Sequence, residues 1–369
     1  MGEWKECQLG DLIIFQRGHD LPKTKMQGGE YPVVGSNGII GYHNEYTTEA
    51  PSITIGRSGN VGKPFLFKGR SWSHNTSLYI KEYKAVDPIF IYYFLQTLDL
   101  GNYAGGSAVP TLNRNHIHTL NVYVPTDIAE QRKIGAVLSA IDDKIELNNA
   151  INENLEQQAQ AIFENEFLSL QSLPDGWKQA SLIDIADYLN GLAMQKYRPS
   201  ANEIGIPVLK IKELRQGCCD DNSEFCSPSI KSDYIIHDGD VIFSWSGSLL
   251  VDFWCGGICG LNQHLFKVSS SNYDKWFYYA WTKHHLDRFI AVAADKATTM
   301  GHIKRDELAK AEVLIPNETD YNRIGALLQP IYDLIISNRI ENKKLAETRD
   351  SLLPKLMSGE IDMSEVDYE

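Results

Sequence analysis

The stretch IGAVLSAIDDKIELNNAINENL, Ile134–Leu155, recurs in altered form as IGALLQPIYDLIISNRIENKKL, Ile324–Leu345. Apolar residues alternate in both copies at spacings of four and three, the pattern of a helix that packs lengthwise against another helix. The seam of the first copy, extended on both sides, is Ile134, Leu138, Ile141, Ile145, Asn148, Asn152, Leu155, Ala159 and Ile162. The seam of the second is Ile324, Leu328, Ile331, Ile335, Asn338, Asn342, Leu345, Arg349 and Leu352. The pattern predicts two helices of about 35–40 residues, each about 50–60 Å long.

Each seam contains two asparagines, Asn148 and Asn152 in the first and Asn338 and Asn342 in the second. If the helices are antiparallel, positions whose numbers sum to 490 face each other, which sets Asn148 against Asn342 and Asn152 against Asn338. Buried asparagine layers lower stability but define register and orientation. We therefore interpret these residues as register determinants of an antiparallel coiled coil. The alternative is that they are solvated positions on a shorter bundle.

The similarity between the two halves extends beyond the helices. GEWKECQLGDL from Gly2 corresponds to DGWKQASLIDI from Asp175, and VYVP ending at Pro125 corresponds to VLIP ending at Pro316. Between them YPVV matches IPVL, SLYI matches HLFK, and FIYYFL matches WFYYAW. The offset between the copies rises from 175 to 187 after YPVV, which predicts an insertion of about 12 residues within 211–234.

We predict an α/β fold of mixed α+β globular domains with two long helices and an internal pseudo-two-fold repeat. The predicted boundaries are 1–126 for the first globular domain, 127–173 for the first helix, 174–316 for the second domain, and 317–369 for the second helix and C-terminal tail. Short apolar runs bounded by Gly, Ser and Asn predict strands at 52–56, 77–81, 240–245 and 265–268. Aromatic helices are expected at about 87–100 and 273–294.

The charge is unevenly distributed. The chain has a net charge of −13, whereas DNA-binding proteins usually have a basic surface. The balances are +1 for 1–126, −6 for 127–173, −3 for 174–316 and −5 for 317–369, so the acidity belongs mainly to the helical segments. The polar start of the chain and the absence of an apolar run of about 20 residues favour a cytoplasmic location.

Four further sequence features complete the pattern: GWK from Gly176, VPTDIAEQRKIGAVLSAIDDKI from Val124, GSAVPTLNRNHI from Gly106 and SLLPKLMSGEI from Ser351. With the repeat, they make nearly the whole chain resemble the specificity (S) subunits of type I restriction–modification systems. The resemblance implies two target recognition domains, each reading one half of a split, asymmetric double-stranded DNA sequence in the major groove.

The resemblance also implies that the helices separate these domains and that two methyltransferase (M) subunits dock on the chain. The methyltransferase carries S-adenosylmethionine and methylates adenine, and a restriction (R) subunit that uses ATP and Mg²⁺ is recruited. One departure is visible: the first helix begins with Glu130–Gln131, whereas the second has Asp320–Tyr321. Because of this difference from the family pattern, it stays open whether both helix starts dock their partners identically.

We predict no cofactor, metal or catalytic site in the chain itself. GRSGNVGK, Gly56–Lys63, lacks the spacing and the hydroxyl residue of a P-loop, and it is either a DNA-approaching loop or a ligand-free glycine hairpin. The tripeptide containing Glu82 is a weak nuclease motif. The six cysteines lack a C-x-x-C pair, so free thiols are a better interpretation than a zinc site.

Candidate DNA-binding residues are cations and amides in loops, because Arg and Lys contact guanine and phosphate while Asn and Gln contact adenine. In the first domain they are Arg17, Lys23, Arg57, Asn60, Lys63, Asn75, Asn113 and Arg114. In the second they are Lys196, Arg198, Lys210, Lys212, Arg215, Ser246, Gln263, Lys304 and Arg305. Two other functions stay open: a coiled-coil adaptor that does not touch DNA, and a nuclease that acts alone.

Overall fold

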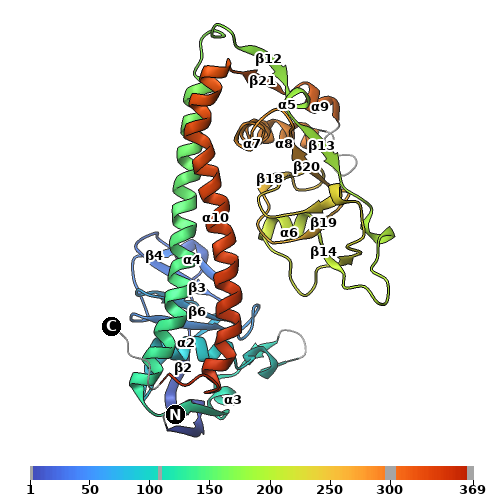
Figure 1. Ribbon diagram of the computed structural model, residues 1–369. Helices are drawn as coiled ribbons and strands as arrows, with labels where there is room; N and C mark the ends of the chain where they lie inside the picture. Colours follow the sequence, from blue (N-terminus) through green and yellow to red (C-terminus); the bar gives the residue numbers. More distant parts are fainter. Residues whose placement is uncertain (1–2, 107–109, 296–304, 364–369) are drawn as a thin grey trace. The chain divides into compact units, whose positions relative to one another are not determined.

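The computed structural model describes residues 3–106, 110–295 and 305–363, which divide into two units. The first unit contains residues 1–144 and 345–369, and the second contains residues 145–344. The division falls inside the two long helices, α4 (Ile128–Phe163) and α10 (Glu318–Met357). Each unit therefore has one globular head and one section of each helix (Figure 1).

The first head, residues 4–125, consists of small sheets that flank an aromatic helix. Its four-stranded sheet has the order β2-β8-β5-β6, and a three-stranded sheet has the order β4-β3-β7. The elements are β1 (Trp4–Gln8), α1 (Leu9–Leu12), β2 (Ile13–Arg17), η1 (Lys23–Lys25), β3 (Tyr31–Gly35), β4 (Gly38–His43), β5 (Ser52–Gly56), β6 (Pro64–Phe67), β7 (Trp72–Ser73), β8 (Ser77–Tyr83), α2 (Pro88–Gln96), η2 (Leu100–Tyr103), β9 (Ala104–Gly105), β10 (Thr111–Leu112), α3 (Arg114–His118) and β11 (Asn121–Pro125).

The second head, residues 178–315, has sheets of the order β13-β20-β17-β18 and β15-β14-β19-β16. Its elements are β12 (Lys178–Ser181), α5 (Leu182–Ile185), β13 (Asp187–Asn190), η4 (Met194–Lys196), β14 (Ile206–Leu209), α6 (Ile211–Gln216), β15 (Phe225–Cys226), η5 (Ser232–Tyr234), β16 (Ile235–Ile236), β17 (Val241–Ser244), β18 (Leu250–Phe253), β19 (Cys259–Leu261), β20 (Leu265–Ser269), α7 (Lys275–His284), α8 (Leu286–Asp295), α9 (Arg305–Ala309) and β21 (Glu312–Ile315). A π-helical turn, η3 (Glu164–Leu168), follows α4.

The same pairing closes both heads. The first strand pairs antiparallel with the last, β1 with β11 and β12 with β21, immediately before each long helix begins. The aromatic helices pack against the four-stranded sheets, α2 against β6 and α7 against β18 and β20, and Phe90 and Phe277 are buried there. Side chains of α4 and α10 belong to the same cores, Ile134 and Leu356 in the first unit and Phe163 and Ile324 in the second. Each head is therefore anchored to a section of both helices.

The two aromatic helices differ from the prediction in length. α2 ends at Gln96, and the expected helix at 273–294 is two helices, α7 and α8, separated at His285. His285 is buried, and its Nε2 lies 2.8 Å from the carbonyl oxygen of Glu312 on β21. This hydrogen bond connects the break between α7 and α8 to the closing strand of the head. A single continuous helix over 273–294 was a wrong prediction.

The starts of α4 and α10 make equivalent contacts although their residues differ. Gln131 accepts a hydrogen bond from the amide of Asp87, the residue that caps α2, at 2.8 Å. The Tyr321 hydroxyl accepts one from the amide of Asp274, which precedes α7, also at 2.8 Å. Asp320 likewise accepts from the Trp177 indole at 2.9 Å. Although Glu130–Gln131 is replaced by Asp320–Tyr321 in the second copy, the contacts that attach each helix to its own head are thus preserved.

The sections of α4 and α10 lie side by side and antiparallel within each unit. In the second unit Asn148 Nδ2 donates to Asn342 Oδ1 at 2.9 Å, and Asn338 Nδ2 donates to Asn152 Oδ1 at 2.8 Å. These hydrogen bonds join the residues that the sequence analysis expects to face each other, whose numbers sum to 490. Asn148 is 1% exposed and Asn152 is 6% exposed, so neither is a solvated position. In the first unit Arg349 Nη1 donates to Asp142 at 2.7 Å across the same pair of helices.

Replacing Asn152 by alanine is expected to lower the free energy of unfolding of the second unit by about 1–3 kcal/mol, because the buried Asn338 amide loses its acceptor. The change is measured as a shift in the urea or thermal unfolding transition. The matched control is the double variant Asn152→Leu/Asn338→Leu, which removes both polar groups. It should unfold near the wild-type transition or above it. Equal destabilisation by both variants would contradict the paired-amide explanation.

The predicted insertion lies between β14 and β15. In the first head the corresponding strands β3 and β4 are joined by residues 36–37 alone, whereas in the second head residues 210–224 make the connection and contain α6. The strands themselves pair in the same way, Pro32 opposite Tyr42 and Pro207 opposite Phe225. The scaffold is thus shared while this loop differs.

Candidate nucleic-acid interface

Three strand ends meet at one edge of the four-stranded sheet in the first head. β2 ends at Arg17 and β5 ends at Gly56, while β8 begins at Ser77 in the opposite direction. Because Arg17 pairs with Leu78 and Gly56 pairs with Ser77, the residues beyond these ends emerge together. We call the group that they present the first polar edge: Arg17, Asp20, Arg57, Asn75 and Arg114.

Backbone hydrogen bonds connect the segments that contain Arg57, Asn75 and Arg114. The Arg57 amide donates to Thr76 O at 2.8 Å, and the Leu112 amide donates to Arg57 O at 2.9 Å. The second bond places Arg114, the first residue of α3, beside the end of β2, where it lines a shallow hollow with Arg17 and Asp20. Four segments that are distant in sequence therefore supply one surface.

Asp20 organises the first polar edge. It accepts a hydrogen bond from the Asn75 side-chain amide, and it lies 3.7 Å from the Arg17 guanidinium. Arg17 and Asp20 remain 53% and 73% exposed, so the ion pair is weak and the guanidinium is accessible to an anion. Burial lowers the pKa of the neighbouring His74, which favours a neutral ring there.

The glycine-rich stretch 56–63 forms a tight hairpin between β5 and β6. The Gly56 amide donates to Lys63 O at 3.0 Å, and the Gly62 amide donates to Gly56 O at 2.8 Å. A Cβ at Gly56 would lie 1.7 Å from the carbonyl oxygen of Asn60, so only glycine fits. The chain folds back on itself, and Asn60 is exposed at the turn. The hairpin does not form the phosphate cradle of a P-loop.

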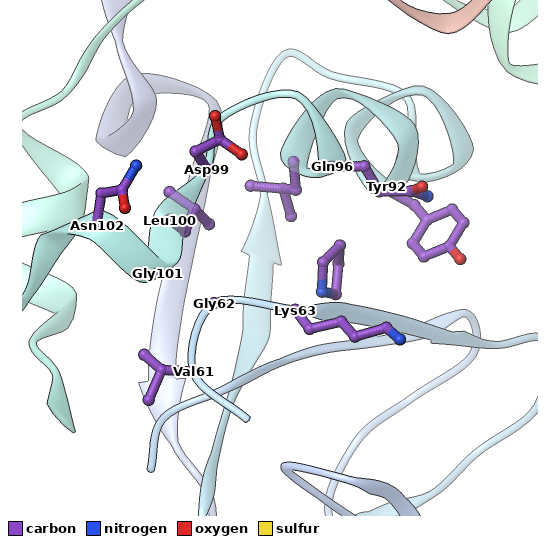
Figure 2. Close-up of a pocket in the computed structure, with 11 residues that line it drawn as sticks. Val61, Gly62, Lys63, Tyr92, Gln96, Asp99, Leu100, Gly101 and Asn102 are labelled. Carbon is purple, nitrogen blue, oxygen red and sulfur yellow. The ribbon is translucent and has the colours of Figure 1, made fainter. Parts of the chain in front are cut away.

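Lys63 belongs to a different surface. It lines a cavity of about 450 Å³ with Tyr92, Gln96 and Asp99, on the α2 side of the hairpin. Figure 2 shows its side chain extending toward Tyr92 and away from Asp99. Its ammonium lies 5.9 Å from the Phe65 ring centroid. Lys63 therefore does not lie with Arg17, Arg57 and Arg114, because its side chain lines the cavity on the α2 side.

The second head has an equivalent edge at the same strand ends. β13 ends at Asn190, β17 ends at Ser244, and β20 begins at Leu265, which pairs with Ser244. The group presented there, the second polar edge, is Asn190, Trp245, Ser246, Gln263 and Arg305.

Hydrogen bonds connect the members of the second polar edge. The Trp245 indole donates to Asn190 Oδ1 at 3.0 Å, and Ser246 Oγ lies 3.0 Å from His264 Nδ1. Gln263 Nε2 lies 3.4 Å from His264 Nε2. These contacts hold the Trp245 ring and the Asn190 and Gln263 amides at these strand ends, while the buried Ser246 hydroxyl contacts His264.

The two edges correspond position by position. Gly18 follows Arg17 and Gly191 follows Asn190, and a Cβ at either glycine would lie about 2 Å from a carbonyl oxygen of the facing loop, His74 O at 2.1 Å or Asn262 O at 2.2 Å. Arg114 and Arg305 each begin the short helix that precedes the closing strand. By strand register, the matched pairs are Arg17 and Asn190, Arg57 and Trp245, and Asn75 and Gln263. Arg114 and Arg305 match by their place at the start of these helices.

The family model described as the type I restriction modification DNA specificity domain matches residues 1–157 and 174–347. The chain belongs to this family. It is similar to the MjaIX specificity subunit of Methanocaldococcus jannaschii, with 28% identity over 75% of this chain and 70% of that protein. It is also similar to the HindI specificity subunit of Haemophilus influenzae, with 20% identity over 68% of this chain and 71% of that protein. The fold is that of the S subunit of a type I restriction–modification system from M. genitalium, with a TM-score of 0.64, 15% identity and 96% coverage of both chains.

Several cations that the sequence proposes for this specificity subunit are engaged within the second head. Arg198 lies 3.0 Å and Lys210 2.6 Å from Glu224, while Lys212 lies 2.8 Å from Asp220. These carboxylates offset part of their charge and make them weaker candidates for DNA contacts than the polar edges. Lys196 is exposed at the end of η4, Lys23 is exposed on η1, and Lys304 lies outside the described residues.

Three further candidates have structural roles. Asn113 Oδ1 accepts from the Asn115 amide at 3.0 Å and caps α3, which leaves Arg114 as the exposed cation of that turn. Arg305 Nη2 donates to Tyr188 O at 3.0 Å, so this guanidinium helps to hold α9 against β13. Ser246 is 2% exposed, and we therefore interpret it as a positioning residue for His264.

Sequence reasoning missed Asn190, Trp245 and His264. Asn190 and Trp245 match Arg17 and Arg57 by strand register, and the spacing of the two copies could have indicated them. His264 follows the candidate Gln263 directly.

The weak nuclease motif lies away from the first polar edge. Glu82 lies near the end of β8, opposite the end that meets the first polar edge. His118 accepts a hydrogen bond from the Phe15 amide at 2.9 Å. No group of three or more His, Cys, Asp or Glu side chains suited to a metal occurs within 3–106, 110–295 and 305–363, and no helix there is long and apolar enough to cross a membrane.

Proposed function

We propose that the chain is the non-catalytic DNA-reading subunit of a type I restriction–modification complex, and that each polar edge reads one half of a bipartite, asymmetric target. The observation that carries the proposal is the pair of polar edges at matching backbone positions. A shared scaffold with different side chains is what two dissimilar half-sites require.

The chemistry of the first polar edge suits guanine and phosphate. Arg17, Arg57 and Arg114 converge from three segments, and a guanidinium can bind guanine O6 and N7 through two parallel hydrogen bonds. Asn75 adds an amide of the kind that pairs with adenine. Asp20 orients two of these groups without burying them.

The second polar edge has a different character. Gln263 and Asn190 supply amides, Trp245 supplies an aromatic ring, and Arg305 supplies a cation at the start of α9. Amide groups favour adenine, and apolar rings can contact the thymine methyl group. We therefore expect the second half-site to differ from the first in its bases.

We further propose that α4 and α10 form an antiparallel coiled coil that sets the spacing between the half-sites and docks two methyltransferase subunits. Support comes from the antiparallel contacts inside each unit, the buried asparagine pairs and the presence of both helices in both units. S-adenosylmethionine would be supplied by the methyltransferase, and ATP and Mg²⁺ by the restriction subunits.

The test is to assemble the chain with its methyltransferase, methylate a DNA library, and sequence the modified adenines. The expected result is a motif of two dissimilar halves at one constant separation, absent when the methyltransferase acts alone. Methylation that does not depend on the chain, or a chain that binds partners but adds no sequence preference, would instead support the adaptor function.

A further inference from the structure

The second head carries a helical element next to its polar edge that the first head lacks. In the first head the β3–β4 turn touches the glycine hairpin: a Cβ at Gly59 would lie 3.1 Å from Ser36 Oγ. The Ser36 amide also approaches Thr76 Oγ1 at 3.3 Å. This turn is therefore a neighbour of the first polar edge. In the second head the same connection, residues 210–224, contains α6.

Direct contacts join α6 to the β17–β18 turn, which also contains Trp245 and Ser246 of the second polar edge. Arg215 Nη2 donates to Ser248 Oγ in the β17–β18 turn. Ser244 Oγ donates to the carbonyl oxygen of Ser248 at 2.8 Å, in the same turn that contains Ser246. A Cβ at Gly247 would lie 3.8 Å from the Ile211 side chain. The guanidinium of Arg215 and the second polar edge therefore lie at the same turn.

α6 is held rigidly in spite of its short length. Leu214 is 3% exposed and packs with the core formed by Leu209 and Trp254. Glu213 is also buried, accepts from the Lys210 amide at 3.2 Å, and accepts from Ser223 Oγ at 3.1 Å. Such fixation limits the entropy that would be lost when a side chain of α6 binds a ligand.

Arg215 differs from the neighbouring cations in its partner. Lys210 and Lys212 lie beside the carboxylates of Glu224 and Asp220, which offset their charge. Arg215 is exposed and hydrogen bonds to a neutral hydroxyl, which positions the guanidinium and leaves its charge uncompensated by that contact. A positioned guanidinium is suited to two-point recognition of guanine.

We propose that Arg215 is a specificity-determining residue, which reads a guanine in the second half-site from α6 and has no counterpart in the first head. The inference rests on the proposed function and deepens it. It predicts that the second half-site contains at least one base pair whose recognition depends on the loop that distinguishes the heads.

The experiment uses the full chain assembled with its methyltransferase and a DNA library randomised in each half-site separately. Arg215→Ala is expected to reduce discrimination at one G·C pair of the second half-site by about 10- to 100-fold, with the first half-site unchanged. Arg215→Lys should retain most of the binding but not the discrimination, since an ammonium lacks the two-point geometry. Unfolding temperatures of all variants verify that α6 remains folded.

Lys231→Ala is the matched control, an exposed cation of the second head whose charge Asp233 offsets, and it should leave the base preference unchanged. Uniform weakening of every sequence by Arg215→Ala would identify a phosphate contact and overturn the proposal. An unchanged preference in a wild-type complex that reads a bipartite motif would also overturn it. If the wild-type complex shows no bipartite motif, the proposed function itself fails.

Discussion

Replacing Arg339 by alanine is expected to lower the free energy of unfolding of the second unit by about 3 kcal/mol, the largest stability effect that we predict for one side chain. Arg339 lies on α10, and its guanidinium donates to Asp252 on β18 at 2.6 Å and to Glu156 on α4 at 2.9 Å. One side chain thus joins both helices to the head of that unit. Its side chain is only 26% exposed, and the two carboxylates are 27% and 36% exposed.

The cost arises because removal of the guanidinium leaves two partly buried carboxylates facing each other without a cation. These contacts also raise the pKa of Arg339, although burial alone would lower it, so the guanidinium stays charged. The measurement is the unfolding transition of the second unit, followed by the fluorescence of its tryptophans. A loss smaller than about 1 kcal/mol would show that water enters and replaces the guanidinium at little cost.

Arg323→Ala is the matched control for Arg339. Arg323 is also on α10, and it forms a two-point ion pair with Glu166 at 2.7 and 2.9 Å. Its side chain is 51% exposed, so water screens the pair, and the expected loss is at most about 1 kcal/mol. The contrast between the two arginines tests burial rather than the number of hydrogen bonds.

The double variant Arg17→Ala/Arg114→Ala is expected to weaken binding to DNA with the first half-site by about 100-fold, because each guanidinium contributes at least about tenfold to a good base contact. Both side chains line the same hollow on the first head. Binding is measured on the complex with its methyltransferase at one defined salt concentration, since phosphate contacts make affinity depend on salt. Methylation of targets altered only in the second half-site should show the same discrimination as in the wild type.

Arg70→Ala provides the control on the same head. Arg70 is exposed, lies 2.8 Å from Glu49, and its guanidinium lies 4.6 Å from the Tyr46 ring centroid. It has no place in the first polar edge, so its removal should change affinity by less than about threefold. If both variants weakened binding equally, general positive charge rather than the first polar edge would explain the affinity.

The long helices were the part of the fold that sequence reasoning described best. The spacing of four and three from Ile134 to Ile162 and from Ile324 to Leu352 can be read from the chain, because helical periodicity is local and needs no knowledge of distant contacts. The same reasoning placed Asn148 beside Asn342 and Asn152 beside Asn338. The extra loop of the second head could also be located, since the largest change in the repeat offset, from 175 to 187, falls across it.

The polar edges were predicted less well. Arg17, Arg57, Asn75 and Arg114 were chosen for their chemistry, but nothing local says that they converge while Lys63 lies on another side. Their convergence depends on strand register, which moves side chains between faces when it shifts by one residue. The helix break at His285 depends likewise on a contact with Glu312 on a distant strand.

Two related heads and two helices with matched asparagines could be read from the chain alone, because repeats and periodicity are properties of the order of residues. The tertiary structure alone decided which side chains share a surface: it brought Asn190 and Trp245 to the second polar edge and placed Arg215 beside it. The physical reason is that these neighbours are joined by strand pairing and hydrogen bonds between residues far apart in the chain, which leave no local signal.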